Sequence, residues 1–146
     1  RYVHRLLDAQ GGWRVSFARN GVEALESLAA APPAVVLTDM QMPRMDGLEL
    51  VETIREKFPH IPVVLMTGSG SERIAVQALK AGAADYVPKQ ALAHDLAPAL
   101  DRVLAGRQAE HRRFRVLAGM TRRSSQFVLE NDPSLVPPLV GLFRED

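Results

Sequence analysis

The sequence contains no cysteine among its 146 residues, which excludes disulfide bonds and thiolate metal sites. Aromatic residues make up only 5% of the chain, and no apolar run reaches the length of a membrane-spanning helix. The chain does not open with a charged and then apolar leader. These absences lead us to expect a cytoplasmic protein that is not inserted in a membrane.

Net charge is also low, at +1, but its distribution is uneven. Residues 1–101 carry a net charge of −2, residues 102–123 carry +6 and residues 124–146 carry −3. The pattern of the basic segment predicts one helix. Such a run of basic residues is more often a solvated helical connector than a nucleic-acid-binding site. No helix-turn-helix spacing supports a DNA-binding output, so nucleic acid is not an expected partner.

Hydrophobic periodicity predicts alternating helices and strands. Expected helices are 1–10, 22–30, 47–58, 72–81 and one starting at Asp95 with Pro98 in its first turn; expected strands are 13–18, 35–39, 63–66 and 84–87. Farther on, 126–130 reads as a strand and 133–143 as the start of a helix. This alternation predicts a doubly wound, parallel α/β domain.

Three chemically useful side chains stand at the ends of successive buried strands: Asp39, Thr67 and Lys89. The carboxyl ends of parallel strands meet at one edge of a sheet, so a carboxylate, a hydroxyl and an amine are expected to converge there. The carboxylate can attack phosphorus, while the amine and hydroxyl bind phosphoryl oxygens. Taken alone, Asp39 has an alternative interpretation as a residue that caps a turn. Asp46 and Glu49 have the spacing of a helix capping box, which favours a structural role for Asp46.

The chain resembles the receiver domain of two-component response regulators. The motifs that carry the resemblance are Asp39-Met40-Gln41-Met42-Pro43 followed by Met45-Asp46-Gly47, then Met66-Thr67-Gly68, 83–89 (Ala-Ala-Asp-Tyr-Val-Pro-Lys) and 18–25 (Ala-Arg-Asn-Gly-Val-Glu-Ala-Leu). Motif, order and spacing agree together over residues 1–105. A departure is Gln90, where many family members have proline.

The resemblance implies a role for each residue at the sheet edge. Asp39 would accept a phosphoryl group from a histidine kinase or phosphotransfer protein, and would bind Mg²⁺ together with the backbone carbonyl of Gln41. Thr67 and Lys89 would bind the phosphoryl oxygens, and Tyr86 would reorient with Thr67. The receiver would then be a switch rather than an enzyme, acting through the family's fourth helix, fifth strand and last helix, a surface that also suits a homodimer.

The resemblance also implies a flavodoxin-like strand order 2-1-3-4-5, with a central first strand that ends in two acids of the magnesium site. Residues 1–146 begin in the helix after that strand. We expect the strand to precede Arg1, with donation by another chain as a less favoured route. Without it, strands 13–18 and 35–39 would lie about 10 Å apart and unpaired, and Mg²⁺ binding and phosphorylation would be weak.

We therefore predict a receiver over 1–105, a basic helical linker over 106–123, and an output domain or docking tail beginning at 124–146. Residues 127–140 are similar to the opening of anti-sigma-factor-type serine kinases of the GHKL ATPase family, without their nucleotide-binding motif. Two alternative functions are a phosphorylation-independent pseudo-receiver and a haloacid-dehalogenase-type phosphatase. The phosphatase would need an acid two residues after Asp39, and that position holds Gln41.

Overall fold

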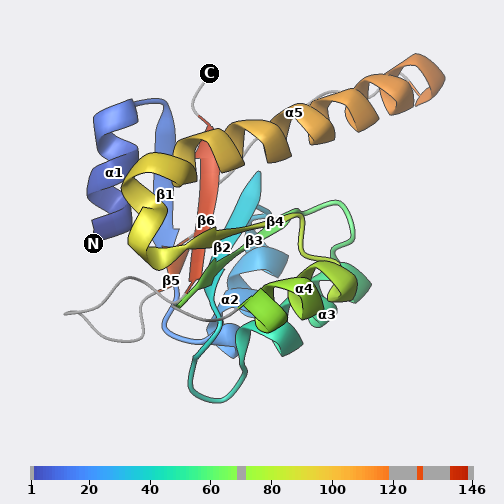
Figure 1. Cartoon of the computed structure of the whole chain (residues 1–146). Helices are drawn as coiled ribbons and strands as arrows, with labels where there is room; N and C mark the ends of the chain where they lie inside the picture. The colour runs from blue at the N-terminus through green and yellow to red at the C-terminus, as the bar shows by residue number, and fades with distance from the viewer. Residues whose placement is uncertain (1, 69–71, 119–127, 130–138, 145–146) are drawn as a thin grey trace.

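The computed structural model describes residues 2–68, 72–118, 128–129 and 139–144 (Figure 1). Its helices are α1 (Tyr2–Gln10), α2 (Gly21–Ala30), α3 (Gly47–Lys57), α4 (Glu72–Ala81) and α5 (Leu92–Ala118), with a 3₁₀ turn at Lys89–Ala91. Its strands are β1 (Trp13–Phe17), β2 (Val35–Asp39), β3 (Val63–Thr67), β4 (Asp85–Pro88), β5 (Val128–Leu129) and β6 (Leu139–Arg144). Helices and strands alternate through α5, which confirms the predicted α/β class.

The strands form one sheet in the order β1-β6-β2-β3-β4, with β5 paired to β6. Strands β2, β3 and β4 are parallel, and the register places Asp39 opposite Met66 and Thr67 opposite Pro88. The carboxyl ends of these three strands therefore lie along one edge. We call this the carboxyl edge, and the opposite edge, where β3 and β4 begin, the amino edge.

Alternation along the buried strands divides the core into two layers, one on each face of the sheet. Val35 and Leu37 of β2 pack toward α1 and α5, whereas Val36 packs toward α2, α3 and α4. Figure 1 shows α1 and α5 together on one side of the sheet and the other three helices on the opposite side. All five residues of β2 and of β3 are buried, as expected for parallel strands covered on both faces.

The position between β1 and β2 is filled by β6, which runs antiparallel to both neighbours. We expected β1 and β2 to lie apart and unpaired in the absence of a strand before Arg1. For the described residues this expectation is wrong, because a segment far along the chain supplies the backbone partners of both strands. The expected helix over 133–143 is also wrong for 139–143, which are strand; residues 133–138 lie outside the described residues. Within the predicted strand 126–130, only Val128–Leu129 is described, and it is β5.

Helix α5 begins at Leu92, three residues earlier than expected from Asp95. Pro98 therefore lies in the second turn of the helix and not in its first, so the N–H that proline lacks would otherwise have joined the helical ladder. The helix continues to Ala118 and projects beyond the body of the domain in Figure 1. Among the described residues, no helix is both long enough and apolar enough to cross a membrane.

A proline in β6 tests this strand arrangement. Gly141 has Ser16 of β1 on one side and Val36 of β2 on the other. Gly141→Pro removes a backbone N–H from a central strand, so we expect amide hydrogen exchange to accelerate in β2 and β1. Gly141→Ala keeps the N–H and should retain most of the protection. Equal exchange in the proline variant and the wild type would mean that β6 does not occupy this position.

Candidate phosphoryl-acceptor site

Asp39 is the last residue of β2 and lies at the carboxyl edge. The apolar run before it anchors the strand in the core, so the carboxylate is held at a fixed place while its oxygens reach the surface. Asp39 as a residue is 9% exposed and its side chain 13%. A carboxylate this deeply placed requires hydrogen bonds or an opposite charge to offset its loss of water.

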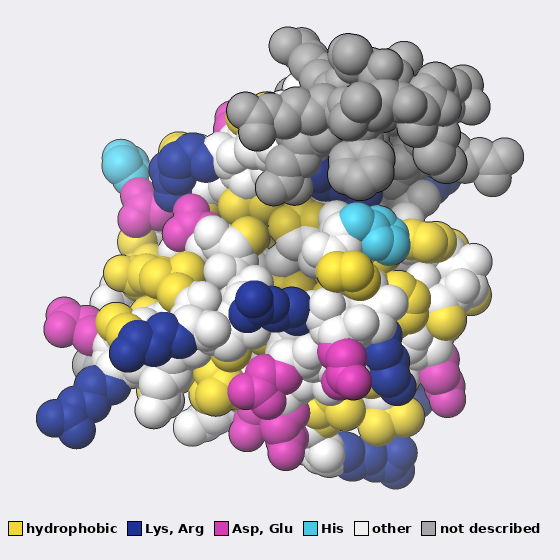
Figure 2. All heavy atoms as spheres, turned by 90° about the vertical axis from the view of Figure 1, so that its right-hand side faces the viewer, with side chains coloured by type: hydrophobic (Ala, Val, Ile, Leu, Met, Phe, Trp, Pro, Cys, Tyr) yellow, Lys and Arg dark blue, Asp and Glu magenta, His cyan; other side chains and the backbone are white. Residues whose placement is uncertain are grey.

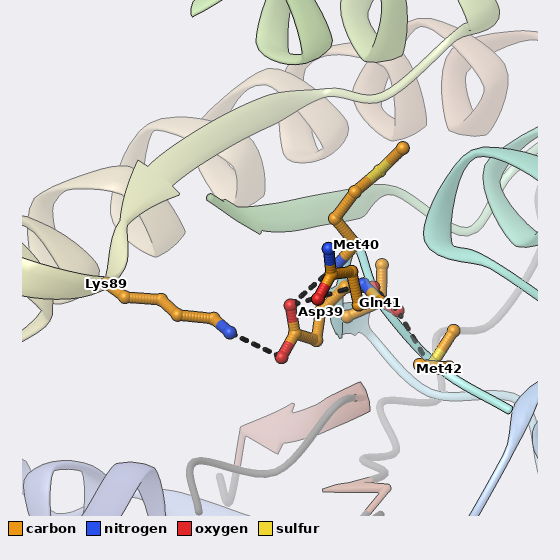
Figure 3. Close-up of polar contacts among 6 residues, drawn as sticks. Asp39, Met40, Gln41, Met42 and Lys89 are labelled. Atoms are coloured by element: carbon orange, nitrogen blue, oxygen red, sulfur yellow. Dashed lines mark hydrogen bonds and ion pairs between the residues drawn. The ribbon is translucent and has the colours of Figure 1, made fainter. Parts of the chain in front are cut away.

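Both oxygens of the Asp39 carboxylate have partners, as Figure 3 shows. Oδ1 accepts a hydrogen bond of 2.7 Å from the backbone N–H of Met40 and a longer one of 3.5 Å from that of Gln41. Oδ2 forms an ion pair of 2.6 Å with Nζ of Lys89, which comes from just past the end of β4. The structure therefore brings together two of the residues predicted from the sequence, separated by 50 positions in the chain.

Thr67 ends the neighbouring strand β3 and is 3% exposed. The register pairs Asp39 with Met66, so Thr67 lies one residue farther along the same edge. A hydroxyl at this place stands beside the strand that carries the carboxylate. Its predicted position at the carboxyl edge is confirmed, and its predicted role in binding phosphoryl oxygens stays a prediction.

Tyr86 lies in β4, three residues before Lys89, and is 38% exposed. Leu65 of β3 is its register partner, and its backbone N–H donates to the side chain of Asp85 at 2.8 Å. A tyrosine exposed to this extent has room to change rotamer. The structure thus leaves the predicted switch role of Tyr86 open as a hypothesis.

The loop after Asp39 is shaped by a close approach of α3 to the end of β2. The N–H of Gly47 donates to the carbonyl of Met40 at 2.8 Å. A Cβ at position 47 would meet the carbonyl oxygen of Asp39 and would lie 2.9 Å from the Cα of Met40, so only glycine fits. Within this loop Arg44 has a φ of 68°, which is uncommon for a residue with a side chain.

The capping box predicted at the start of α3 is confirmed. Oδ1 of Asp46 accepts from the N–H of Glu49 at 2.8 Å, and the side chain of Glu49 accepts from the N–H of Asp46 at 3.0 Å. Asp46 is therefore engaged in positioning α3. Its carboxylate accepts from the backbone N–H of Glu49 at the helix start and is not a member of the Asp39 and Lys89 pair.

Two contacts at the site escaped the sequence reasoning. Thr38 donates from Oγ1 to the carbonyl of Asp39 at 3.0 Å, and its oxygen lies 3.5 Å from the sulfur of Met42. The close approach of Gly47 to the Asp39 backbone is the second. A glycine directly after a helix-capping acid was a usable signal for Gly47, whereas Thr38 looks like any polar residue in a strand.

The described residues provide a partial ligand set for the expected Mg²⁺. They contain no cluster of three or more acidic, histidine or cysteine side chains suited to a metal. Asp39 and the carbonyl of Gln41 would supply two oxygen ligands, while Mg²⁺ takes six in an octahedron. Strand β6 adds no acid, because its sequence from Leu139 to Arg144 contains neither Asp nor Glu. By themselves these residues do not fit a tight magnesium site.

Comparison with known proteins agrees with this geometry. The family model of the response regulator receiver domain matches residues 1–101. The DNA-binding transcriptional regulator NtrC of Escherichia coli K12 is 42% identical over 89 residues, which are 61% of this chain and 19% of that protein. The C4-dicarboxylate transport transcriptional regulatory protein DctD of Rhizobium meliloti is 36% identical over 123 residues, 84% of this chain and 25% of that protein.

Among solved structures, the receiver domain of NtrX from Brucella abortus superimposes with a TM-score of 0.67 at 30% identity, covering 71% of this chain and 88% of that one. This chain spans about a fifth to a quarter of the length of NtrC and DctD. The sequence match, the shared fold and the acid and lysine paired at the carboxyl edge all lead to one assignment: the chain belongs to the response regulator receiver domain family.

Proposed function

We propose that Asp39 is the phosphoryl acceptor of this receiver. The observation that carries the proposal is the 2.6 Å pair between Asp39 Oδ2 and Lys89 Nζ at the carboxyl edge. It holds a carboxylate where a substrate can reach it and places a cation beside the oxygens that gain charge during transfer. The 2.7 Å bond from the Met40 N–H fixes the orientation of the other carboxylate oxygen.

The reaction is a transfer from the phosphohistidine of a histidine kinase or phosphotransfer protein. An Asp39 carboxylate oxygen forms the new bond to phosphorus, and the bond from phosphorus to the histidine nitrogen breaks with its electron pair leaving on the imidazole. Lys89 exchanges part of its contact with Asp39 for a contact with the phosphoryl oxygens. Thr67 donates a hydrogen bond from its hydroxyl to another of these oxygens. Mg²⁺, held by Asp39 and the Gln41 carbonyl, would add charge neutralisation, but this partial set predicts weak metal binding and slow transfer.

Movement of Thr67 would carry the signal away from the site. The exposed side of the domain next to β4 presents Val76 and Leu79 of α4 and Tyr86 of β4, which are 51%, 42% and 38% exposed. Repacking of Tyr86 after Thr67 moves would alter this surface, formed by α4, β4 and α5. The surface suits either a second copy of the chain or an output module, and α5 leads from it toward the C-terminal region.

The C-terminal region was expected to begin an output domain or to be a docking tail, and we favour the tail. Its support is the pairing of β6 with β1 and β2, which makes residues 139–144 part of the receiver sheet. We keep the boundaries 1–105, 106–123 and 124–146 as a proposal. The similarity of 127–140 to GHKL-type kinases stays a prediction.

A phosphorylation-independent interaction module is the second candidate, and the exposed apolar side chains of α4 and β4 favour it. Partner binding through α4, β4 and α5 would then not depend on Asp39. A haloacid-dehalogenase-type phosphatase has less support, because Gln41 stands where its second acid is required and cannot protonate a leaving group.

Thr67→Ala separates phosphoryl uptake from switching. We expect the alanine variant to take up phosphoryl from acetyl phosphate to a similar final extent, because Asp39 and Lys89 remain. The accompanying amide chemical-shift changes in α4 and β4 should be largely lost, since the buried hydroxyl that would follow the phosphoryl group is gone. The measurement is a ¹H–¹⁵N correlation spectrum with and without acetyl phosphate.

The control for that experiment is Thr53→Ala. The Thr53 hydroxyl donates to the carbonyl of Glu49, one turn earlier in α3, in an exposed bond away from the carboxyl edge. This variant should show the wild-type shifts. Full shifts in Thr67→Ala would exclude Thr67 as the switch residue, and wild-type shifts that persist in Asp39→Asn would favour the phosphorylation-independent alternative.

A further inference from the structure

The strand that carries Asp39 holds a second polar side chain, Thr38, directly before it. Thr38 is 0% exposed, and the residues that precede it in β2 are all apolar. A valine has nearly the same branched shape and would bring no polar group into the core. A buried hydroxyl costs free energy unless it forms a hydrogen bond, so the partners of this hydroxyl indicate what the threonine does.

The Thr38 hydroxyl contacts both ends of the segment that begins with Asp39. Oγ1 donates to the backbone carbonyl of Asp39 at 3.0 Å, and it lies 3.5 Å from the sulfur of Met42. A thioether sulfur is a weak acceptor, whereas a backbone carbonyl is a strong one. The hydroxyl therefore holds the carbonyl of Asp39, with the Met42 sulfur beside it.

The carbonyl of Asp39 belongs to the same peptide unit as the N–H of Met40. A peptide unit is planar, so a contact that fixes the direction of its C=O also fixes the direction of its N–H. That N–H donates to Oδ1 of Asp39 at 2.7 Å, as Figure 3 shows. Hydrogen bonds in such a chain also polarise one another. The Thr38 hydroxyl thus acts on the Asp39 carboxylate through one rigid unit.

Gly47 at the start of α3 bounds this peptide unit by packing. A Cβ at position 47 would meet the carbonyl oxygen of Asp39 and lie 2.9 Å from the Cα of Met40. Packing of this kind limits where the unit lies, whereas a hydrogen bond is directional and sets how the unit is rotated. The two contacts therefore have separate effects on the same peptide.

We propose that Thr38 is a positioning residue for the phosphoryl acceptor. Its hydroxyl orients the peptide unit whose N–H holds Oδ1 of Asp39, while Lys89 holds Oδ2 at 2.6 Å. The carboxylate is then presented to phosphorus in one orientation, which lowers the entropic cost of reaching the reactive geometry. The proposal rests on the role of Asp39 as acceptor, and Thr38 acts on the reaction only through this peptide.

The test compares Thr38→Val, which removes the hydroxyl and keeps the branched shape, with Thr38→Ser, which keeps the hydroxyl and removes a methyl group. We expect Thr38→Val to take up phosphoryl from acetyl phosphate about three- to tenfold more slowly than the wild type, the usual effect of one hydrogen bond. Thr38→Ser should retain most of the wild-type rate. If Thr38 only fills space, the serine variant, which leaves a gap in the core, should be the slower of the two.

A second readout needs no phosphoryl donor. The amide proton of Met40 in a ¹H–¹⁵N correlation spectrum reports the 2.7 Å bond to Asp39 Oδ1. We expect it to move upfield in Thr38→Val, because that bond weakens, and to stay near its wild-type position in Thr38→Ser. An unchanged Met40 amide in Thr38→Val, or the reverse order of rates, would overturn the proposal. If the wild type itself takes up no phosphoryl, the acceptor role of Asp39 fails, and the Met40 amide alone decides whether Thr38 orients the carboxylate.

The matched control is Thr53→Val, the same substitution at a hydroxyl that donates to the carbonyl of Glu49 at 2.7 Å. Thr53 belongs to α3, which leads away from the carboxyl edge, and the connection after α3 lies on the side of the molecule that faces the viewer in Figure 2. Charged side chains are mixed with hydrophobic ones over that side. The control should show the wild-type rate and the wild-type Met40 amide. Equal effects of Thr53→Val and Thr38→Val would also contradict the proposal.

Discussion

Gly47→Ala should destabilise the fold by about 1–3 kcal/mol, the range for forcing an extra methyl group into a packed site. The new Cβ would meet the carbonyl oxygen of Asp39 and lie 2.9 Å from the Cα of Met40. Both atoms belong to the backbone, so no side chain can rotate away to make room. The N–H of Gly47 would lose its 2.8 Å bond to Met40 as the start of α3 shifts.

Urea denaturation followed by circular dichroism measures this loss. Gly106→Ala is the matched control, since it is the same substitution inside α5 at a position with no atom within 4 Å of the added Cβ. It should leave stability unchanged or raise it by up to about 1 kcal/mol, because alanine is the better helix former. Equal effects of the two substitutions would refute the close approach of α3 to the end of β2.

Lys89→Met should slow phosphoryl uptake by about 10²-fold, the usual cost of losing one group that stabilises charge in a transition state. Methionine keeps most of the length of the lysine side chain but removes the cation that lies 2.6 Å from Asp39. The Asp39 carboxylate then attacks phosphorus without a positive charge beside the phosphoryl oxygens. Rates of uptake from acetyl phosphate, followed by intact-mass spectrometry, measure the effect.

The control for Lys89→Met is Lys80→Met, which removes an exposed lysine in the last turn of α4. It changes the net charge equally and should leave the rate near that of the wild type. A similar small effect of both substitutions would mean that Lys89 serves only to balance the charge of Asp39 in the resting protein.

The site could be predicted from the sequence because each of its residues follows a strongly patterned strand. Apolar runs over 35–37 and 63–66 indicate the strands β2 and β3, and parallel pairing then brings Asp39, Thr67 and Lys89 to one edge. The 2.6 Å pair of Asp39 with Lys89 is a consequence of that topology. The orientation of the Tyr86 side chain was harder to predict, because the alternation of residues in β4 does not show that Tyr86 lies exposed.

The strand between β1 and β2 could not be predicted. Residues 139–144 contain a glycine and follow two prolines, and a short apolar run of this kind suits a helix or a strand equally well. Long-range pairing decides that this segment is a strand: β1 and β2 each have backbone groups that need hydrogen-bond partners, and β6 supplies partners for both. Local periodicity carries no information about backbone groups elsewhere in the chain that need partners.

Intact-mass spectrometry of this chain after incubation with acetyl phosphate and Mg²⁺ tests the central claim most directly. We expect a slow gain of one phosphoryl group that is absent in Asp39→Asn and retained in Asp46→Asn, since Asp46 is occupied by the capping box of α3. No gain in the wild type, or a gain that persists in Asp39→Asn, would contradict the assignment of Asp39 as the phosphoryl acceptor.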